Sequence, residues 1–309
     1  MVPVLRNVLK APCPLENENG CVTSAVEAGG TMIISIASGK GGTGKTTIAT
    51  SLALAIGKVQ FLDCDVEEPN AHIFLKPQIQ ERIAVGILVP RVDESRCTFC
   101  RKCAEVCEYN AIVVIKKKVL VFPDLCHGCG GCAYICPESA IAEIEKPIGV
   151  VERGRAGEID FIHGVLNIGE PMAPPLIREV KKHIDYHDNC VIIDASPGTS
   201  CPVVEAVKGS DFCILVTEPT PFGLNDLGLA VAMLRKLAIP CGVVINCADI
   251  GDDEVMRYCD REGIPVLMTI PWDRRIAAAY STGIPLVEAL PHYKSGFVDL
   301  YETLRKEVN

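Results

Sequence analysis

Long apolar runs are missing from this sequence of 309 residues. No stretch approaches 18 consecutive apolar residues, so we expect no stable membrane insertion. Basic residues are outnumbered, with 30 Lys and Arg against 39 Asp and Glu and a formal net charge of −9, which argues against nucleic acid as a partner. The first residues lack the apolar core of a signal peptide, so we expect a cytoplasmic protein. With 49% hydrophobic and 22% charged residues, the composition excludes a disordered or collagen-like chain.

Cysteine, in contrast, is abundant, with 17 residues, an odd number. A chain of this length buries roughly three-quarters of its unfolded surface and needs no disulfides to fold. A reducing cytosol also disfavours disulfides. Eight of the 17 cysteines fall within 91–146. We therefore expect the cysteines of this segment to bind metal.

Two segments far apart in the sequence share an α/β pattern. A strand at Met32–Ala37, a helix at Lys45–Ile56 and a strand at Val59–Asp63 are predicted, the opening of a parallel sheet. Further on we predict four apolar strands and a last helix: Cys190–Asp194, Phe212–Thr217, Cys241–Asn246, Val266–Ile270 and Phe297–Val308. Continuous apolar runs are typical of strands covered on both faces. The prediction is a discontinuous α/β domain over 31–90 and 147–309, with a mainly parallel sheet covered by helices on both faces, an arm over 1–30 and an inserted domain over 91–146.

A glycine-rich loop follows the first predicted strand. The run Gly39-Lys40-Gly41-Gly42-Thr43-Gly44-Lys45-Thr46 fits the phosphate-loop (P-loop) pattern G-x-x-x-x-G-K-[ST], and Thr47 follows it. Between a strand and a helix, such a loop holds phosphates on backbone N–H groups at a helix N-terminus. Lys45 is expected to reach the β- and γ-phosphates of ATP, and the Thr46 hydroxyl to bind Mg²⁺. The alternative, a glycine-rich turn without a ligand, is disfavoured because pattern and context agree.

Residues 97–115 and 126–144 are two copies of one motif at a constant offset of 29 residues. Each copy has the spacing C-x₂-C-x₂-C-x₃-C of bacterial ferredoxins, in which the fourth cysteine ligates the other cluster. This resemblance implies two [4Fe–4S] clusters and an α+β insert, with one cluster on Cys97, Cys100, Cys103 and Cys136 and the other on Cys126, Cys129, Cys132 and Cys107. Zinc is the competing metal, but structural zinc uses two C-x₂-C pairs rather than triplets with a trailing fourth cysteine. Glu108 stands where ferredoxins have proline, which affects only the local turn.

Charge within the insert is balanced, with eight basic and eight acidic residues over 91–146. The run Lys116–Lys118 lies between strand-like segments. It is most simply a solvated hairpin turn, and alternatively it steers an acidic partner.

The lysine-glycine-glycine start of the phosphate loop resembles the MinD/Mrp/nitrogenase-iron-protein family of ATPases. In that family the lysine at the position of Lys40 reaches the nucleotide of a dimer partner; the alternative here is a solvated loop lysine. The resemblance implies that Asp65 orients the attacking water and that Asp63 and Asp194 lie on the Mg²⁺ side of the site. It also implies a second switch in which the Gly198 N–H senses the γ-phosphate.

The same resemblance extends to the nucleotide base and covers roughly 31–90 and 147–309. Asn246 ends a predicted strand and matches the family's adenine-reading asparagine. Pro271 and Asp273 lie in the stretch Ile270-Pro271-Trp272-Asp273, which matches the loop that flanks the base.

Three cysteines outside the repeats are further candidates. Cys201 follows Asp194 by seven residues, an offset at which the nitrogenase iron protein carries a cluster ligand at its dimer interface. That enzyme uses a second cysteine, for which 149–169 offers no counterpart here. Cys201 is therefore a possible interface thiol or a small packed residue, and Cys13 and Cys21 either complete a metal site or have no ligand role.

The chain as a whole resembles MinD-superfamily ATPases with an inserted ferredoxin domain. This implies an Mg-dependent ATPase that forms a homodimer or pairs with a related ATPase. The favoured function is ATP-dependent assembly or transfer of iron–sulfur or related metal clusters. The alternatives are ATP-gated electron delivery to a partner protein and a MinD-like positioning switch. Neither the client nor the redox partner is specified by the sequence.

Overall fold

The computed structural model describes residues 30–187 and 190–308, so Cys13, Cys21 and nearly all of the predicted arm lie outside the described residues. Nine strands form one sheet in the order β11-β10-β9-β1-β8-β2-β7-β6-β3. The strands are β1 (Met32–Ala37), β2 (Gln60–Cys64), β3 (Gln78–Val92), β6 (Ile141–Ala156), β7 (Ile159–Leu166), β8 (Cys190–Ala195), β9 (Phe212–Thr217), β10 (Cys241–Asn246) and β11 (Val266–Ile270). From β11 to β7 the pairs are parallel, whereas β6 runs antiparallel to both β7 and β3.

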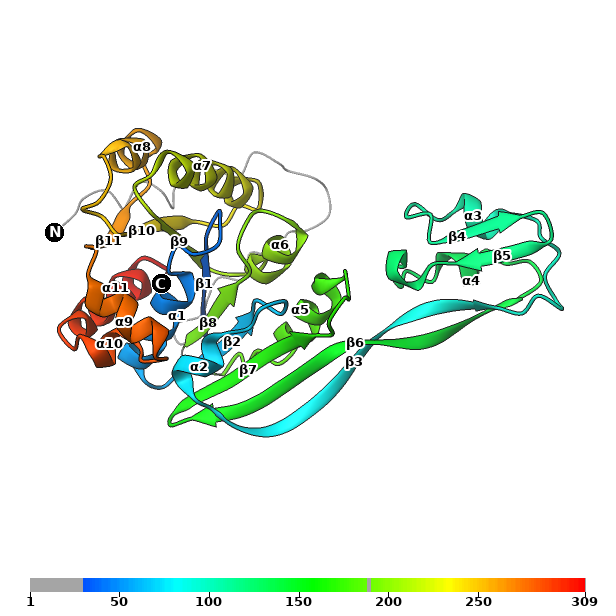
Figure 1. Cartoon of the computed structure of the whole chain (residues 1–309), viewed down its shortest axis with the longest axis horizontal. Helices are drawn as coiled ribbons and strands as arrows, with labels where there is room; N and C mark the ends of the chain where they lie inside the picture. The colour runs from blue at the N-terminus through cyan, green and yellow to red at the C-terminus, as the bar shows by residue number, and fades with distance from the viewer. Residues whose placement is uncertain (1–29, 188–189, 309) are drawn as a thin grey trace.

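Helices cover both faces of the sheet (Figure 1). One face packs against α1 (Lys45–Ile56), α2 (Ala71–Leu75), α9 (Arg274–Ser281), α10 (Leu286–Ala289) and α11 (Tyr293–Val308). The other packs against α5 (Ala173–Lys181), α6 (Cys201–Val207), α7 (Pro221–Lys236) and α8 (Glu254–Glu262). Within β1, Ile34 and Ile36 pack on the first face and Ile33 on the second. Because side chains alternate between two covered faces, a buried strand is apolar along its whole length.

The two outermost strands extend well beyond the sheet as a ribbon, defined here as β3 and β6 together (Figure 1). The ribbon is paired from Gln78 and Arg155 at the body to Val92 and Ile141 at its far end. At about 3.4 Å per residue, the 15 residues of β3 span roughly 50 Å. Both strands run unbroken across the boundaries predicted near 90 and 147.

A small lobe, residues 93–140, lies at the far end of the ribbon (Figure 1). It contains α3 (Lys102–Glu105), β4 (Ile112–Ile115), β5 (Lys118–Val121), the 3₁₀-helix η2 (Pro123–Leu125) and α4 (Gly131–Tyr134). The hairpin of β4 and β5 turns at Lys116 and Lys117, as the sequence predicts. Buried Ile112, Val114 and Val119 form a core of the lobe's own.

Candidate nucleotide site and cysteine lobe

The phosphate loop joins β1 to α1 at the carboxyl edge of the parallel strands. Gly39 packs so closely on α7 that an added Cβ would lie 2.3 Å from the Asp226 carbonyl oxygen. Gly44 has φ +90°, and a Cβ there would meet the Asn246 amide nitrogen at 2.6 Å. No side chain caps α1, so its first N–H groups are left for an anion.

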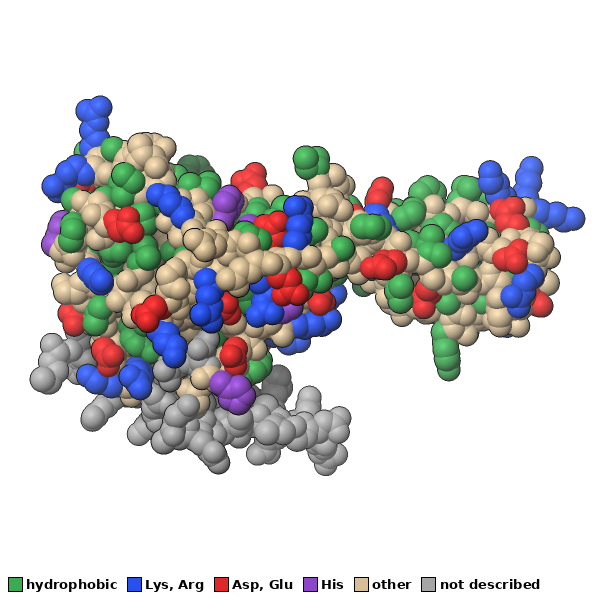
Figure 2. All heavy atoms as spheres, turned by 90° about the horizontal axis from the view of Figure 1, so that it is seen from below, with side chains coloured by type: hydrophobic (Ala, Val, Ile, Leu, Met, Phe, Trp, Pro, Cys, Tyr) green, Lys and Arg blue, Asp and Glu red, His purple; other side chains and the backbone are tan. Residues whose placement is uncertain are grey.

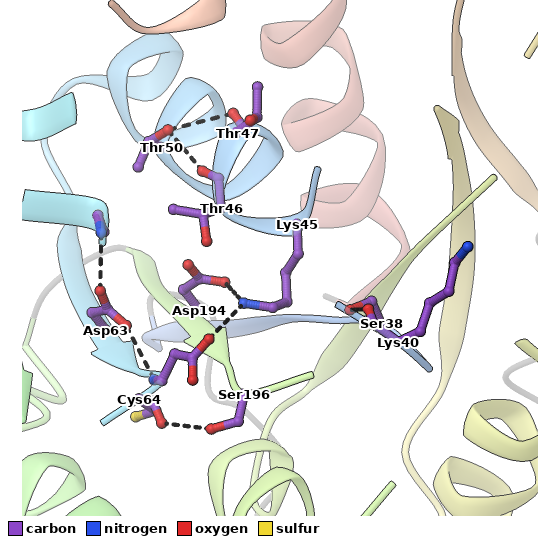
Figure 3. Close-up of polar contacts among 12 residues, drawn as sticks. Ser38, Lys40, Lys45, Thr46, Thr47, Thr50, Asp63, Cys64, Asp194 and Ser196 are labelled. Carbon is purple, nitrogen blue, oxygen red and sulfur yellow. Dashed lines mark hydrogen bonds and ion pairs between the residues drawn. The ribbon is translucent and has the colours of Figure 1, made fainter. Parts of the chain in front are cut away.

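Lys45 lies among buried carboxylates at the start of α1 (Figure 3). Its Nζ is 2.8 Å from Asp194 Oδ1 and 3.7 Å from Asp65 Oδ2. Burial alone would lower the pKa of Lys45, but these carboxylates outweigh burial and hold the pKa above its ordinary value. The second oxygen of Asp194 is buried and has no hydrogen-bond partner among the described residues. An acceptor in this position, beside a lysine and Thr46, fits a site for a divalent cation.

Asp63 lies deeper, paired in register with Asp194. Its two oxygens accept hydrogen bonds from the backbone N–H groups of Asp65 and Ala71, at 3.0 and 3.1 Å. Burial, reinforced by Asp194, raises the pKa of Asp63 to about 8. Burial also raises the pKa of Asp65, to about 6, although Lys45 opposes the shift. Asp63 therefore anchors the segment 65–71 rather than lining the cavity itself.

These raised pKa values predict a pH-dependent stability. An unfolded Asp has a pKa of about 3.9, so stability should fall as pH rises from about 4 to about 8. The loss is up to about 1.4 kcal/mol per pH unit for each group. Urea denaturation in the presence of a chelator and without nucleotide measures it. Asp63→Asn should flatten the curve between about pH 6 and 8; parallel curves for the two proteins would contradict the assignment.

Lys40 lies outside the carboxylate cluster, with its side chain directed away from Lys45 (Figure 3). Its Nζ forms an ion pair with Glu218 Oε2 at 3.2 Å. The Gly198 N–H, expected to sense the γ-phosphate, donates to the Ser38 carbonyl at 2.8 Å. For Lys40 to reach a partner's nucleotide, its ion pair with Glu218 must open. For the Gly198 N–H to sense the γ-phosphate, its hydrogen bond to Ser38 must open.

A cavity of about 480 Å³ opens beside the phosphate loop, a size that suits a nucleotide. It is lined by ten of the predicted site residues: Gly41, Gly42, Gly44, Lys45, Thr46, Thr47, Asp65, Asn246, Pro271 and Asp273. Gly39, Lys40, Thr43, Asp63 and Asp194 do not line it. Asn246 is already engaged, because its amide donates to the Thr43 carbonyl at 3.0 Å and accepts from the Cys247 N–H.

Sequence reasoning missed several residues of this cavity, among them Glu68, Asn70, Glu218, Cys247 and Tyr280. One signal could have found Tyr280, because it follows Ile276 by one helical turn on α9, directly after the Asp273 loop. The others come from loops or strand ends and carry no spacing signal. Trp272, in the predicted base loop, lines the cavity and is half exposed. Its indole offers a stacking surface for a base.

A row of polar side chains crosses the sheet from this site to the ribbon. Asp194, Asp63, His163, Glu152 and Arg82 are paired in register on β8, β2, β7, β6 and β3, so they face the same side. His163 Nε2 lies 2.8 Å from Glu152 Oε2, and Arg82 Nε lies 3.4 Å from Glu152 Oε1. We call these five residues the cross-strand row. It joins the carboxylates beside Lys45 to both strands that carry the lobe.

The eight cysteines of the repeats line two separate cavities of the lobe. One is lined by Cys97, Cys100, Cys103 and Cys136, and the other by Cys107, Cys126, Cys129 and Cys132. These are the two groups of four that the ferredoxin resemblance predicts. Among the described residues, no three His, Cys, Asp or Glu side chains converge on a single metal ion. Each cavity thus brings four thiols together, although they do not converge on one ion.

Backbone N–H groups point at sulfurs in both cavities. Phe99 and Gly128 donate to the Sγ atoms of Cys97 and Cys126, at 3.4 and 3.5 Å. Ala111 and Ala140 donate to those of Cys107 and Cys136, both at 3.3 Å. Hydrogen bonds from backbone N–H groups to cluster sulfurs are among the features that set the reduction potential of an iron–sulfur cluster.

Cys201 lies apart from both groups of four, exposed at the start of α6. None of the cysteines that the structure describes forms a disulfide. Cys64, Cys190 and Cys213 are buried in strands. Across the described ranges, no helix is both long and apolar enough to cross a membrane.

A strand, a glycine-rich loop, an uncapped helix with Lys45 and Thr46, and carboxylates on adjacent strands together define a P-loop nucleotide site. The family model for the CobQ/CobB/MinD/ParA nucleotide binding domain matches residues 34–286. The chain belongs to this family of P-loop ATPases.

Relatives and solved structures agree with that assignment. An uncharacterised protein of Methanocaldococcus jannaschii is 33% identical over 264 residues, which cover 82% of this chain and 90% of the relative. The iron-sulfur cluster carrier protein of Pyrococcus horikoshii is 24% identical, with 88% of this chain and 84% of the relative covered. The cell division ATPase MinD of Pyrococcus furiosus shares the fold, with a TM-score of 0.56 at 23% identity over 89% of this chain and 98% of that one.

Proposed function

We propose that this protein is an Mg-dependent ATPase that holds two [4Fe–4S] clusters in its distal lobe and uses ATP binding and hydrolysis to drive the assembly or transfer of iron–sulfur or related metal clusters. The observation that carries the proposal is the lining of two lobe cavities by complete groups of four cysteines, in a chain that also has a P-loop ATPase site. The iron-sulfur cluster carrier of Pyrococcus horikoshii supports the choice of cargo.

At the nucleotide, the chain's own residues would position and neutralise phosphate. Lys45 exchanges its contact with Asp194 for the β- and γ-phosphates, and α1 offers its free N–H groups. Thr46 and Asp194 would hold Mg²⁺, which neutralises phosphate charge. Asp63 would fix the neighbouring segment 65–71 through its two hydrogen bonds to backbone N–H groups. Asp65 would orient the attacking water, and Lys40, once released from Glu218, would contribute charge to the nucleotide of a second subunit.

Electron delivery to a partner is a second candidate, favoured by one observation. All eight repeat cysteines line the two lobe cavities in groups of four, which leaves Cys201 as an exposed thiol outside both groups. An electron donor needs only resident clusters, whereas a carrier also needs a labile site. Such a site would require Cys201 from two subunits or the segment that holds Cys13 and Cys21.

Metal analysis tests the proposal. After anaerobic purification we expect about eight iron and eight acid-labile sulfide per chain, because two complete groups of four bind two clusters. Cys136→Ser should damage the cluster of the Cys97 group and spare that of the Cys126 group, and Cys107→Ser is the matched variant with the reverse effect. Iron, sulfide and the spectrum of the reduced clusters are the measurements. Stoichiometric zinc without sulfide would exclude the clusters.

A transfer assay separates the two candidates. Loaded protein mixed with an apo-ferredoxin acceptor should pass iron and sulfide to it faster with Mg-ATP than without. If Cys201 from two subunits forms the labile site, Cys201→Ser should abolish the transfer but leave the eight lobe irons in place. If the protein hydrolyses ATP and passes electrons to the acceptor while no iron leaves it, the result selects electron delivery.

A further inference from the structure

Positive charge gathers at the free end of the distal lobe. Figure 2 shows Lys and Arg side chains projecting there, at the end farthest from the sheet. The patch consists of five exposed residues, Arg101, Lys102, Lys116, Lys117 and Lys118. The Arg101 guanidinium donates to the Val114 carbonyl at 3.4 Å, which holds the start of α3 beside the β4–β5 turn. We call these five residues the basic tip.

The side chains of the basic tip are not ion-paired with any residue that the structure describes, although Asp and Glu side chains also lie on the lobe (Figure 2). Within the described part of the chain, none of its five side chains forms an ion pair within 4.0 Å. Elsewhere the chain is acidic: the formal charge is −9 overall, while 91–146 is balanced. The part of β3 that extends beyond the sheet, residues 86–92, spans roughly 24 Å, about three times the Debye length of about 8 Å at physiological salt. The tip therefore presents a positive field that the acidic body does not cancel.

The two cysteine cavities differ in their charged neighbours. The cavity of Cys97, Cys100, Cys103 and Cys136 is lined by two cations, Arg101 and Lys102, and one carboxylate, Glu138. Val114 and Val119, from both sides of the lysine turn, line it as well. No Lys or Arg lines the other cavity, which has Glu143 at its edge. Each cavity includes one exposed cysteine, Cys100 in the first and Cys129 in the second, but only the first has cations beside it. Positively charged side chains therefore line the cavity of only one of the two groups of cysteines.

We infer that the basic tip is the docking surface for a small acidic electron-carrier protein. Complementary charge guides such a protein to the lobe, while the −9 chain repels it from the body. The docked carrier, in its reduced form, would give one electron to the lobe, and no bond forms or breaks. This inference rests on the proposed clusters and deepens their role by naming the partner class and the group of four that it approaches.

Binding of a flavodoxin, a small acidic one-electron carrier, tests the inference. We expect the triple variant Lys116→Glu/Lys117→Glu/Lys118→Glu to bind oxidised flavodoxin about tenfold more weakly at low salt, measured by calorimetry, and to lose most of the salt dependence. The matching glutamine triple should give an intermediate affinity. The control is Lys58→Glu/Lys236→Glu/Lys294→Glu, which makes the same charge change at exposed lysines of the body and should leave affinity unchanged.

The outcomes separate the inference from the proposed function. Iron and sulfide are measured on every sample, and the rate of lobe reduction by flavodoxin hydroquinone is followed by stopped flow. Absent iron would overturn the proposed function and this inference with it. Eight irons with equal flavodoxin affinity in both triple variants would overturn the docking surface alone. Retention of a mixed-sequence DNA duplex through the same lysines, without an effect on flavodoxin, would assign the tip to nucleic acid and reject the carrier.

Discussion

Lys45→Ala is expected to abolish measurable ATP binding and at the same time to destabilise the protein. The side chain supplies the positive charge for the β- and γ-phosphates, and in the nucleotide-free chain it is the cation within reach of Asp194 and Asp65. Only 7% of it is exposed. Removing one partner of a buried ion pair costs about 3–5 kcal/mol, because the remaining charge is left uncompensated. Calorimetry with ATP and thermal unfolding measure the two effects.

A double variant separates these effects. Lys45→Ala/Asp194→Asn removes the uncompensated carboxylate along with the lysine, so it should regain much of the lost stability without regaining ATP binding. If Lys45→Ala binds ATP as the native protein does, the phosphate-loop assignment is wrong. If it folds as stably as the native protein, the ion pair with Asp194 contributes nothing.

Lys40→Ala should behave differently, because Lys40 pairs with Glu218 outside the carboxylate cluster. ATP binding should persist, while hydrolysis should fall by about 10³-fold or more, the range of a cation supplied in trans. Steady-state turnover and bound nucleotide, measured on the same sample, distinguish the two lysines. Normal turnover in Lys40→Ala would exclude a trans-acting lysine.

The body of the sheet could be predicted from the sequence because its signals are local. β1, α1, β9, β10 and β11 have the bounds that apolar runs and flanking glycines predict. Their strands are buried on both faces, so each is a continuous apolar run that needs no knowledge of its neighbours. The two groups of cysteines, in contrast, follow from the ferredoxin resemblance and not from local spacing, because the fourth cysteine of each group belongs to the other repeat.

The antiparallel edge of the sheet could not be predicted in the same way. β3 begins with Gln78, Gln80 and Glu81, a polar stretch that resembles a loop until its partner β6 is known. That pairing joins residues 49 to 77 positions apart, from Val92 and Ile141 to Gln78 and Arg155. The sequence of either strand alone does not show which distant segment it pairs with or in which register. For the same reason the Lys40–Glu218 ion pair and the cross-strand row became visible only in the structure.

Cluster reduction is expected to change ATP affinity about 5- to 150-fold, the usual range of coupling between two sites. The physical route is the cross-strand row. Mg-ATP would draw Lys45 toward phosphate and Asp194 toward Mg²⁺, which alters the field at Asp63 and, one strand further, at His163. Through Glu152 and Arg82 that change reaches the strands β6 and β3, which continue into the lobe.

Linkage fixes the reciprocal effect, and one pair of variants tests the route. ATP must shift the potential of the coupled cluster by about 60 mV for each tenfold change in affinity, for one electron. Anaerobic ATP titrations of oxidised and reduced protein, with redox titrations in the presence and absence of Mg-ATP, measure both sides. Glu152→Gln removes the negative charge that pairs with His163 and Arg82, so it should reduce the coupling severalfold. Glu81→Gln is the matched control. It removes the ion pair between Glu81 and Arg153, which lies in the same ribbon but outside the cross-strand row, so it should leave coupling intact.

Equal losses in both variants would mean that ribbon stiffness, rather than the row, carries the coupling. Equal ATP affinities in the oxidised and reduced native protein would mean that the lobe acts independently of the ATPase.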